Sequence, residues 1–341
     1  SGEALGGPVS GSVRAKTSSV GPPRIGIDLR IDRAILARVV AFLPSLAPHL
    51  DGFGTFQLSG TLADEFQANI YVAVAQARLA GVSLSELRAP AVLVVTPGSG
   101  TGSLRIPRLS ARFAGGEVRG DLLFRLGDDR TFNANLQLAS LELETLTRIA
   151  SGTSQPASGR ITGRVTLSGP NPAEPERFRG RVNLDLSDAS LVQIPVFREV
   201  DRFLGSSSGG LFEDGDLIGV VAHGNLMVES LTLAGRLAQV HGTGTVGFDG
   251  RLNLEMLVNT SQIIPQTGQA LVVLIPGLRE VAGLRRLATA RVATFLGNRL
   301  LKLRVTGTVR NPTIAIDPTI SVPETAVGSS GVLKLPLELL K

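Results

Sequence analysis

The chain has 341 residues, of which 43% are hydrophobic and 40 are glycine. This hydrophobic content excludes an intrinsically disordered protein, and no apolar run approaches the ~20 residues of a membrane-spanning helix. The absence of cysteine excludes disulfide bonds, thiolate nucleophiles and cysteine-bound zinc. The net charge of +5 is small, and no basic patch alternates with aromatic residues, so nucleic acid is not an expected partner.

Four regions are expected along the chain. Residues 1–24 form a flexible N-terminal segment, and residues 25–154 form a first β-repeat. Residues 155–318 form a second β-repeat, and residues 319–341 form a C-terminal tail or strand. The first regular element is expected to be a helix over 31–47, because apolar residues recur there at helical spacing.

Alternation of apolar and polar residues dominates the rest of the chain and predicts strands with one dry face and one wet face. In 117–126, for example, Val118, Leu122 and Phe124 alternate with polar residues. The segments 132–138, 181–186 and 251–258 follow the same pattern. Short glycine and Asp-Gly links between such segments indicate hairpins. Roughly sixteen candidate strands predict an antiparallel, mostly β protein with a few short amphipathic helices.

The chain also repeats itself. Residues 49–87 are similar to 155–200, and residues 104–140 are similar to 226–261. Self-similarity at a period of ~100 residues predicts an elongated stack of repeats rather than a closed globule. A sheet of about sixteen strands would extend ~75 Å if it never closed.

A long sheet with one hydrophobic face must shield that face from water, and the expected helices are too few to cover it. Either the sheet curls on itself, or the face holds an apolar ligand such as the acyl chains of a lipid. We predict an elongated, curled β-groove. Its lining residues are predicted to be Val118, Leu122, Phe124, Phe132, Leu136, Leu138, Val182, Leu184, Leu186, Val246, Phe248, Leu252 and Leu254.

Two further helices are expected, at 196–204 and 276–301, the second beginning at Pro276. One side of the second helix is apolar, and its other side is basic. Either this helix packs on the sheet with its arginines in water, or the arginines contact the headgroups of a membrane. The residues in question are Arg279, Arg285, Arg286 and Arg291.

No arrangement of residues points to catalysis. Gly242, Gly244 and Gly247 match G-x-G-x-x-G, but a strand pattern follows them where a dinucleotide site needs a helix. We interpret these glycines as parts of a crowded sheet. The three histidines lack the spacing of metal ligands. The chain is therefore expected not to be an enzyme and to need no cofactor or metal.

Three segments resemble the C-terminal region of the AsmA-like family. In 159–204 a glycine-flanked strand and an alternating strand lead through an Ala-x-Leu-x-x-Ile-Pro step toward a helix. Residues 231–256 are similar to the hairpins that follow in the family. Residues 304–318 resemble its closing strand pair, through Gly307, Thr308, Asn311 and Pro312. The resemblance covers 155–318 well and 25–150 more loosely.

The resemblance implies a periplasmic, U-shaped β-groove that is anchored in the inner membrane through a segment missing from this chain. It also implies that phospholipid acyl chains move along the groove for outer-membrane biogenesis. The expected partners are phospholipid or another acyl lipid and the inner- or outer-membrane surface or its proteins. The alternative is an assembly factor that buries its own dry face and acts on outer-membrane proteins by β-strand addition.

Overall fold

The computed structural model describes residues 2–16, 24–41, 49–128, 130–151, 157–191, 194, 197–198, 212–235, 238–260 and 299–317. The first strands are β1 (Gly2–Ala4), β2 (Gly7–Lys16), β3 (Arg24–Ile35), β4 (Leu50–Leu62), β5 (Phe66–Leu79), β6 (Val82–Thr96), β7 (Thr101–Phe113), β8 (Gly116–Leu126) and β9 (Thr131–Glu142). The later strands are β10 (Ser158–Gly169), β11 (Arg179–Ser190), β12 (Asp214–Ala222), β13 (Asn225–Ala234), β14 (Ala238–Gly247), β15 (Leu252–Thr260), β16 (Arg299–Gly307) and β17 (Pro312–Asp317).

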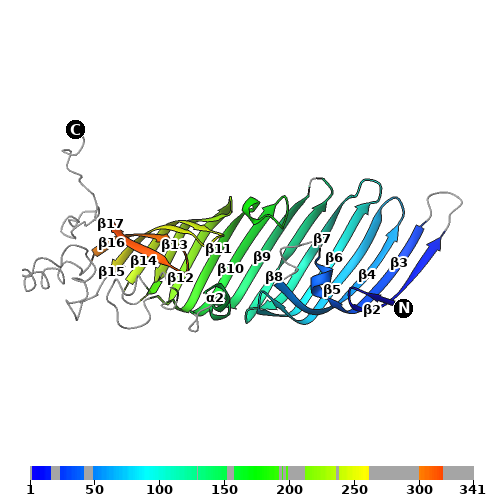
Figure 1. Ribbon diagram of the computed structural model, residues 1–341, viewed down its shortest axis with the longest axis horizontal. Coiled ribbons are helices and arrows are strands. Elements are labelled where there is room, and N and C mark those ends of the chain that lie inside the picture. Colours follow the sequence, from blue (N-terminus) through cyan, green and yellow to red (C-terminus); the bar gives the residue numbers. More distant parts are fainter. Residues whose placement is uncertain are drawn as a thin grey trace, which may run out of the picture.

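All of these strands belong to one antiparallel sheet, which forms an elongated molecule with its strands running across the long axis (Figure 1). The described part of the sheet has 17 strands, and each strand pairs with the strands that precede and follow it in the chain. β1 and β17 do not pair with each other, so the sheet is open. The mostly β, antiparallel and elongated architecture predicted from the alternation is confirmed.

The N-terminal segment differs from the expectation. Residues 2–16 are not a flexible segment, because they form β1 and β2, and β2 pairs with β3 from Val9–Ile31 to Lys16–Arg24. The strand pattern was present in the sequence, but Gly11 and Ala15 supply little hydrophobic surface on the face that Val9 and Val13 share. Backbone pairing with β3 therefore decides this conformation more than side-chain burial does.

The prediction of a helix over 31–47 is also wrong for the first residues of that segment. β3 continues to Ile35, and the helix α1 (Leu36–Val39) is only one turn long. β2 pairs with β3 as far as Ile31, and β4 pairs with it as far as Ile35, and this pairing overrides the helical spacing of the apolar residues. A register shift between Ile31 and Ala34, with Arg33 at φ 57°, bends the end of the strand. Residues 42–48 lie outside the described residues.

Most of the other expected helical residues lie outside the described residues. In 196–204 only Phe197 and Arg198 are described, and both are helical. The segment 276–301 is described only from Arg299, where β16 begins. The sequence reasoning missed one helix, α2 (Leu143–Ser151), which follows β9. A short 3-10 helix at Pro175–Arg177 precedes β11.

The second predicted pair of repeats has the same local structure in both copies. Residues 104–140 form β7, β8 and β9, and residues 226–261 contain β13, β14 and β15. In the first copy the register shifts between the pairs Ile106–Leu122 and Leu109–Gly120. In the second copy it shifts between Val228–Gly244 and Leu231–Gly242, at the equivalent position. Because bulges are placed specifically within a fold, this agreement supports the repeat.

The two long margins of the sheet are built differently (Figure 1). On one, which we call the hairpin margin, short connections such as 63–65, 97–100 and 248–251 join the strands. On the other, the insertion margin, β3 is joined to β4 through α1, and β9 to β10 through α2. The long connections that follow β11 and β15 also start from the insertion margin. Long inserted segments can therefore cover only one margin of the sheet.

The main hydrophobic core lies in the C-terminal half of the sheet. Val258, Leu303 and Val305 are fully buried there, and Met256 is 1% exposed. Their cluster extends to Leu143 of α2 and to Phe212, just before β12. A second, smaller cluster joins Leu36 of α1 to β5, β6 and β7. Both clusters thus connect an inserted helix to the same side of the sheet.

Candidate functional site

One side of the sheet carries a continuous apolar surface, which we call the apolar face. Antiparallel pairing places partner residues on the same side, so their side chains form rows that cross the strands. The longest row begins at Leu109 of β7 and crosses the sheet from β8 to β17 without interruption. Its other members are Gly120, Leu136, Val165, Val182, Gly219, Val228, Gly244, Leu254, Val305 and Ile314.

Glycines in these rows make room for the larger side chains beside them. A Cβ on Gly120 would lie 2.1 Å from the carbonyl oxygen of Asn135 and 2.9 Å from Cδ2 of Leu136. A Cβ on Gly163 would lie 2.2 Å from the carbonyl oxygen of Asn183. Gly244 of β14 makes an equivalent close approach to Asn253, so the sequence GTGTVG is a crowded strand as predicted.

The structure brings most of the predicted lining residues together on the apolar face. The half-buried residues among them are Val118, Leu122, Phe124, Leu136, Leu138, Leu184, Leu186 and Val246. The buried residues among them are Phe132, Val182, Leu252 and Leu254. Phe248 is the exception, because β14 ends at Gly247 and Phe248 lies in the following turn, where it is 49% exposed.

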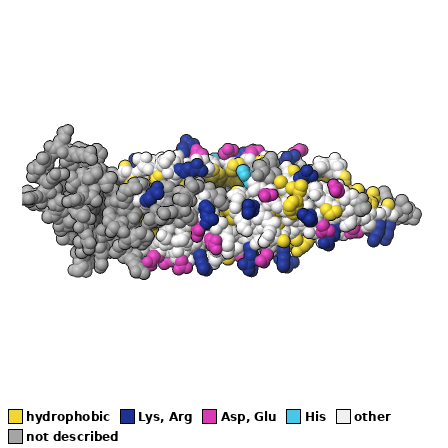
Figure 2. Space-filling view, turned by 60° about the horizontal axis from the view of Figure 1, so that its bottom comes forward, with side chains coloured by type: hydrophobic (Ala, Val, Ile, Leu, Met, Phe, Trp, Pro, Cys, Tyr) yellow, Lys and Arg dark blue, Asp and Glu magenta, His cyan; other side chains and the backbone are white. Residues whose placement is uncertain are grey.

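Burial of the apolar face increases along the chain. Between β3 and β11 most of its large side chains, such as Leu58, Leu122 and Leu184, are only half-buried. In β15 and β16 the corresponding side chains are almost inaccessible. Figure 2 shows patches of hydrophobic side chains on the described part of the molecule, with charged side chains along its edges and between the patches. Unfilled apolar surface is therefore concentrated in the first two-thirds of the sheet.

The insertion margin of the apolar face is closed by packed side chains. Val74, Leu84 and Ala111 lie toward this end of their strands, are buried, and belong to one hydrophobic cluster with Leu36 of α1. Farther along, Leu143 of α2 belongs to the same buried cluster as Phe212. The available signal for α2 was the pair of apolar residues Leu143 and Leu146 at helical spacing within the long connection after β9.

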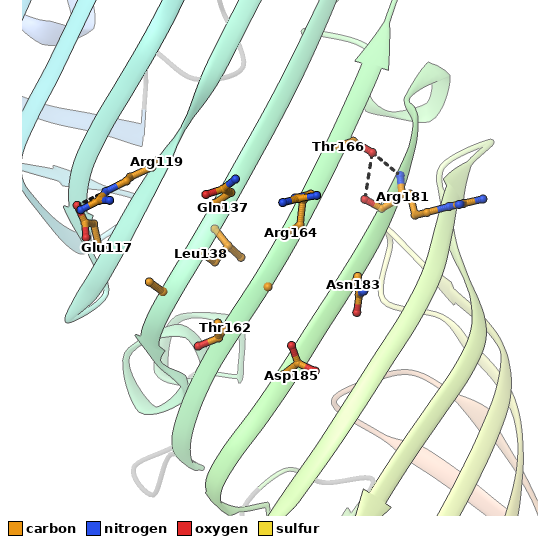
Figure 3. A pocket seen from close by; sticks show the side chains of 12 residues that line it. Glu117, Arg119, Gln137, Leu138, Thr162, Arg164, Thr166, Arg181, Asn183 and Asp185 are labelled. Carbon is orange, nitrogen blue, oxygen red and sulfur yellow. Dashed lines mark hydrogen bonds and ion pairs between the residues drawn. The ribbon is translucent and has the colours of Figure 1, made fainter.

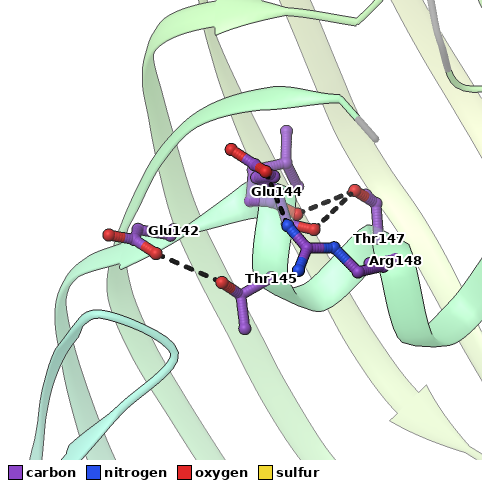
Figure 4. A network of polar contacts seen from close by, with 6 residues as sticks. Glu142, Glu144, Thr145, Thr147 and Arg148 are labelled. Atoms are coloured by element: carbon purple, nitrogen blue, oxygen red, sulfur yellow. Dashed lines mark hydrogen bonds and ion pairs between the residues drawn. The ribbon is translucent and has the colours of Figure 1, made fainter. Parts of the chain in front are cut away.

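A polar network holds α2 at the end of β9 (Figure 4). The Thr145 hydroxyl donates to Oε2 of Glu142 at 3.1 Å, and Arg148 pairs with Oε1 of Glu144 at 2.6 Å. The Thr147 hydroxyl donates to the carbonyl oxygen of Leu143 at 2.9 Å. Acidic residues at the start of this helix and an arginine near its end also complement the helix dipole.

The opposite side of the sheet, the polar face, carries an open cavity of about 590 Å³ (Figure 3). A row of partner residues from four strands crosses it: Arg119, Gln137, Arg164 and Asn183. Arg119 pairs with Glu117 at 2.7 Å, and Asp185 also lines the cavity. The mixed charges and full solvation are typical of a hydrated strand face.

A cavity of about 660 Å³ lies at the hairpin margin, between the turns that join β8 to β9, β10 to β11 and β12 to β13. Arg125, Arg177 and Arg179 line it, together with His223 and Glu176. Its wall also contains Phe132 and Phe178, whose rings meet edge to face with centroids 4.9 Å apart. The sequence pattern did not reveal this site because its residues come from three separate hairpins.

Hydrogen bonds within the β10–β11 connection shape this cavity. The side-chain amide of Asn171 donates to Glu174 at 2.9 Å, and Arg177 donates to the same carboxylate at 3.0 Å. The Asn171 hydrogen bond, followed by that from Arg177, lowers the pKa of Glu174 below its ordinary value. Glu174 is thereby ionised and engaged within the loop, so Glu176 is the acidic residue that lines the cavity.

Within the described residues, no group of three or more histidines and acidic residues is placed to hold a metal ion. No helix in this part of the chain is long and apolar enough to cross a membrane. The arginines predicted to contact a membrane, at 279, 285, 286 and 291, lie outside the described residues. No family model, curated protein or solved structure matches this chain.

Proposed function

We propose that the chain is a non-enzymatic lipid-binding protein that holds the acyl chains of phospholipid against the apolar face and transfers them across the periplasm for outer-membrane biogenesis. The open section of the apolar face, from β3 to β11, is the binding region. The C-terminal section, in which β15 and β16 are almost fully buried, is the stable end of the sheet.

The observation that carries this proposal is the row pattern of the apolar face. Rows of Leu, Val, Ile and Phe cross the strands with no polar side chain between them, as in the row that contains Leu136, Val165 and Val182. An acyl chain needs only such a surface, which gains about 25 cal/mol for each Å² removed from water. A continuous row also lets a chain shift position without losing a polar contact.

The resemblance to the AsmA-like family supports the same function. The motifs that carry it fall on β10 to β17, where the chain forms consecutive hairpins of the open sheet. An elongated sheet with one apolar side agrees with a lipid groove of that family. The periplasmic location and an inner-membrane anchor outside this chain are parts of the proposal that rest on the resemblance alone.

The first experiment is lipid extraction and mass spectrometry on the chain purified without detergent. Leu136 and Leu184 are half-buried in the middle of the apolar face, so we expect Leu136→Asp with Leu184→Asp to abolish lipid co-purification. The matched controls are Gln137→Asp and Asn183→Asp, one residue away on the polar face. These control changes should leave the lipid content unchanged.

Circular dichroism of each variant establishes that β content is retained. Equal lipid content in the apolar-face variant and in the native chain would refute the assignment of the binding face. A native chain that is stable and free of lipid would refute the lipid-binding function itself.

The alternative function, β-strand addition to outer-membrane proteins, is favoured by one observation. β1 covers only residues 7–9 of β2, so the outer edge of β2 from Ser10 to Lys16 has no strand partner among the described residues. Proline at position 13, an exposed residue of this edge at the outer end of the apolar face, would remove one backbone N–H donor. Loss of partner binding in Val13→Pro, with lipid binding retained, would establish this alternative.

A further inference from the structure

We propose that the cavity between the β8–β9, β10–β11 and β12–β13 turns binds the phosphate of an acyl lipid whose tails lie on the apolar face. This inference rests on the proposed function and adds the place and the chemistry of headgroup recognition. The site consists of Arg125 and Arg179 as the phosphate-binding groups, with Phe132 and Phe178 as the apolar wall next to the acyl chains.

The two margins of the sheet decide on which side a headgroup can lie. At the insertion margin, Val74, Leu233 and Val240 are almost inaccessible, so acyl chains cannot leave the face there without displacing packed side chains. At the hairpin margin, Leu126 and Phe248 are 37% and 49% exposed. A lipid on the apolar face therefore keeps its headgroup in water only at the hairpin margin.

Phe132 belongs both to the wall of the cavity and to the apolar face. This residue pairs with Phe124 on β8 and with Gly169 on β10, which places it on the apolar face at its hairpin end. Its ring contacts Phe178 outside the strand, and a Cβ on Gly169 would lie 2.8 Å from Phe132 Cε1. The absence of a side chain at Gly169 thus lets the two rings pack directly against β10.

The charges of the cavity favour an anion. Arg125, Arg177 and Arg179 line it, and Glu176 is the one carboxylate among the described residues of its wall. Arg177 is paired with Glu174 at 3.0 Å, whereas Arg125 and Arg179 have no ion pair within the part of the chain that the structure describes. Two guanidinium groups without a protein anion are suited to phosphate, which accepts several hydrogen bonds from arginine.

The arginines of the polar-face cavity provide a contrast. Arg164 lies in the middle of β10 and, like Arg125, has no ion pair among the described residues. Arg125 and Arg179 also project from the polar face, but they lie at the hairpin-margin ends of β8 and β11. Arg164 lies away from that margin, so a lipid with its tails on the apolar face cannot reach it around the ends of the strands. Arg164 is therefore a matched control of the same residue type.

The test is calorimetric titration of the full chain, below micelle concentrations, with three probes. Dioctanoyl phosphatidic acid has acyl chains and phosphate, dioctanoylglycerol lacks the phosphate, and glycerol 3-phosphate lacks the acyl chains. We expect Arg125→Gln with Arg179→Gln to weaken binding of the phosphatidic acid about tenfold, because hydrogen bonds to a charged group are lost. Dioctanoylglycerol should bind this variant and the native chain equally, and Arg164→Gln should change neither affinity.

Each other result overturns the proposal in a distinguishable way. Equal binding of phosphatidic acid and dioctanoylglycerol by the native chain would show that no headgroup is recognised, while lipid binding itself stands. A loss of affinity in Arg164→Gln as large as in the double variant would place the phosphate elsewhere. Glycerol 3-phosphate binding as tightly as phosphatidic acid would indicate a site for free phosphate esters. Failure of both lipids to bind would refute the proposed function as well.

Discussion

The ring of Phe132, on β9, meets the ring of Phe178, next to β11, edge to face, with centroids 4.9 Å apart and planes inclined by 67°. Phe132 belongs to the apolar face, whereas Phe178 follows the 3-10 helix of the β10–β11 connection. This contact therefore ties the longest described connection of the hairpin margin to the end of the apolar face.

Removing the ring of Phe178 should loosen this connection. We expect Phe178→Ala to lower the free energy of unfolding by about 2 kcal/mol, because half-buried aromatic surface and the ring contact are both lost. Phe178→Leu retains most of the apolar area and should recover roughly half of that loss. Urea unfolding followed by circular dichroism measures both variants. An alanine variant as stable as the native chain would contradict a role for this contact.

The glycines of the apolar face should not tolerate a side chain. A Cβ on Gly163 would lie 2.2 Å from the carbonyl oxygen of Asn183 and 2.8 Å from Cα of Leu184. Gly163→Ala must therefore push β10 and β11 apart, at a cost of about 1–3 kcal/mol in the free energy of unfolding.

Gly98 is the control for this change, because it lies in the β6–β7 turn, where a Cβ would meet nothing within 4 Å beyond its chain neighbours. We expect Gly98→Ala to be neutral or slightly stabilising, because alanine restricts the unfolded chain. Thermal unfolding of the two variants side by side makes the comparison. Equal stability of both variants would mean that the strands adjust without cost at position 163.

Helix α2 should contribute to stability mainly through one buried side chain. Leu143 is 9% exposed and joins the cluster that contains Met256 and Leu303, so Leu143→Ala should cost about 2–4 kcal/mol. Its neighbour Glu144 is exposed and pairs with Arg148. Glu144→Gln should cost less than about 1 kcal/mol, because exposed ion pairs contribute little. Chemical denaturation distinguishes the two effects, and a reversed order would exclude Leu143 as the anchor.

The β10–β11 connection should weaken in acid. Because hydrogen bonds from Asn171 and Arg177 lower the pKa of Glu174 in the folded chain, its stabilising contribution is present above the unfolded value of about 4.3. That contribution is lost as the pH falls through the lowered folded pKa. Amide hydrogen exchange of residues 171–178 should therefore accelerate below about pH 4 relative to the strands. In Glu174→Gln the difference between loop and strands should no longer depend on pH.

Much of the fold could be predicted from the sequence, because the alternation of apolar and polar residues in a strand with one solvent-exposed face has a period of two residues. The alternation in 117–126 and 132–138 identified β8 and β9 and the residues that share the apolar face. The helix expected at 31–47 was wrong over residues 31–35, because the apolar residues there, Ile31 and Ile35, also fit a strand. Pairing with β2 and β4 decided between the two periods.

The candidate site was only partly predictable. Its apolar lining follows from alternation, but the hairpin-margin cavity joins Arg125, Phe178 and His223, which come from three hairpins far apart in sequence. Their proximity depends on the register of β9, β10 and β11, and no local pattern encodes that register. The exposure of Phe248 was missed for a local reason, since the strand ends one residue before it.

The sequence by itself determined that this is an antiparallel, mostly β protein with one apolar side, because a period of two and short glycine turns permit little else. The tertiary structure alone decided how that side is covered. Packing of α1, α2 and the core around Val258 and Leu303 closes the insertion margin and fills the C-terminal end, and it leaves the middle of the face half-buried. Which apolar surface remains available depends on contacts between residues far apart in the chain, which the local pattern cannot specify.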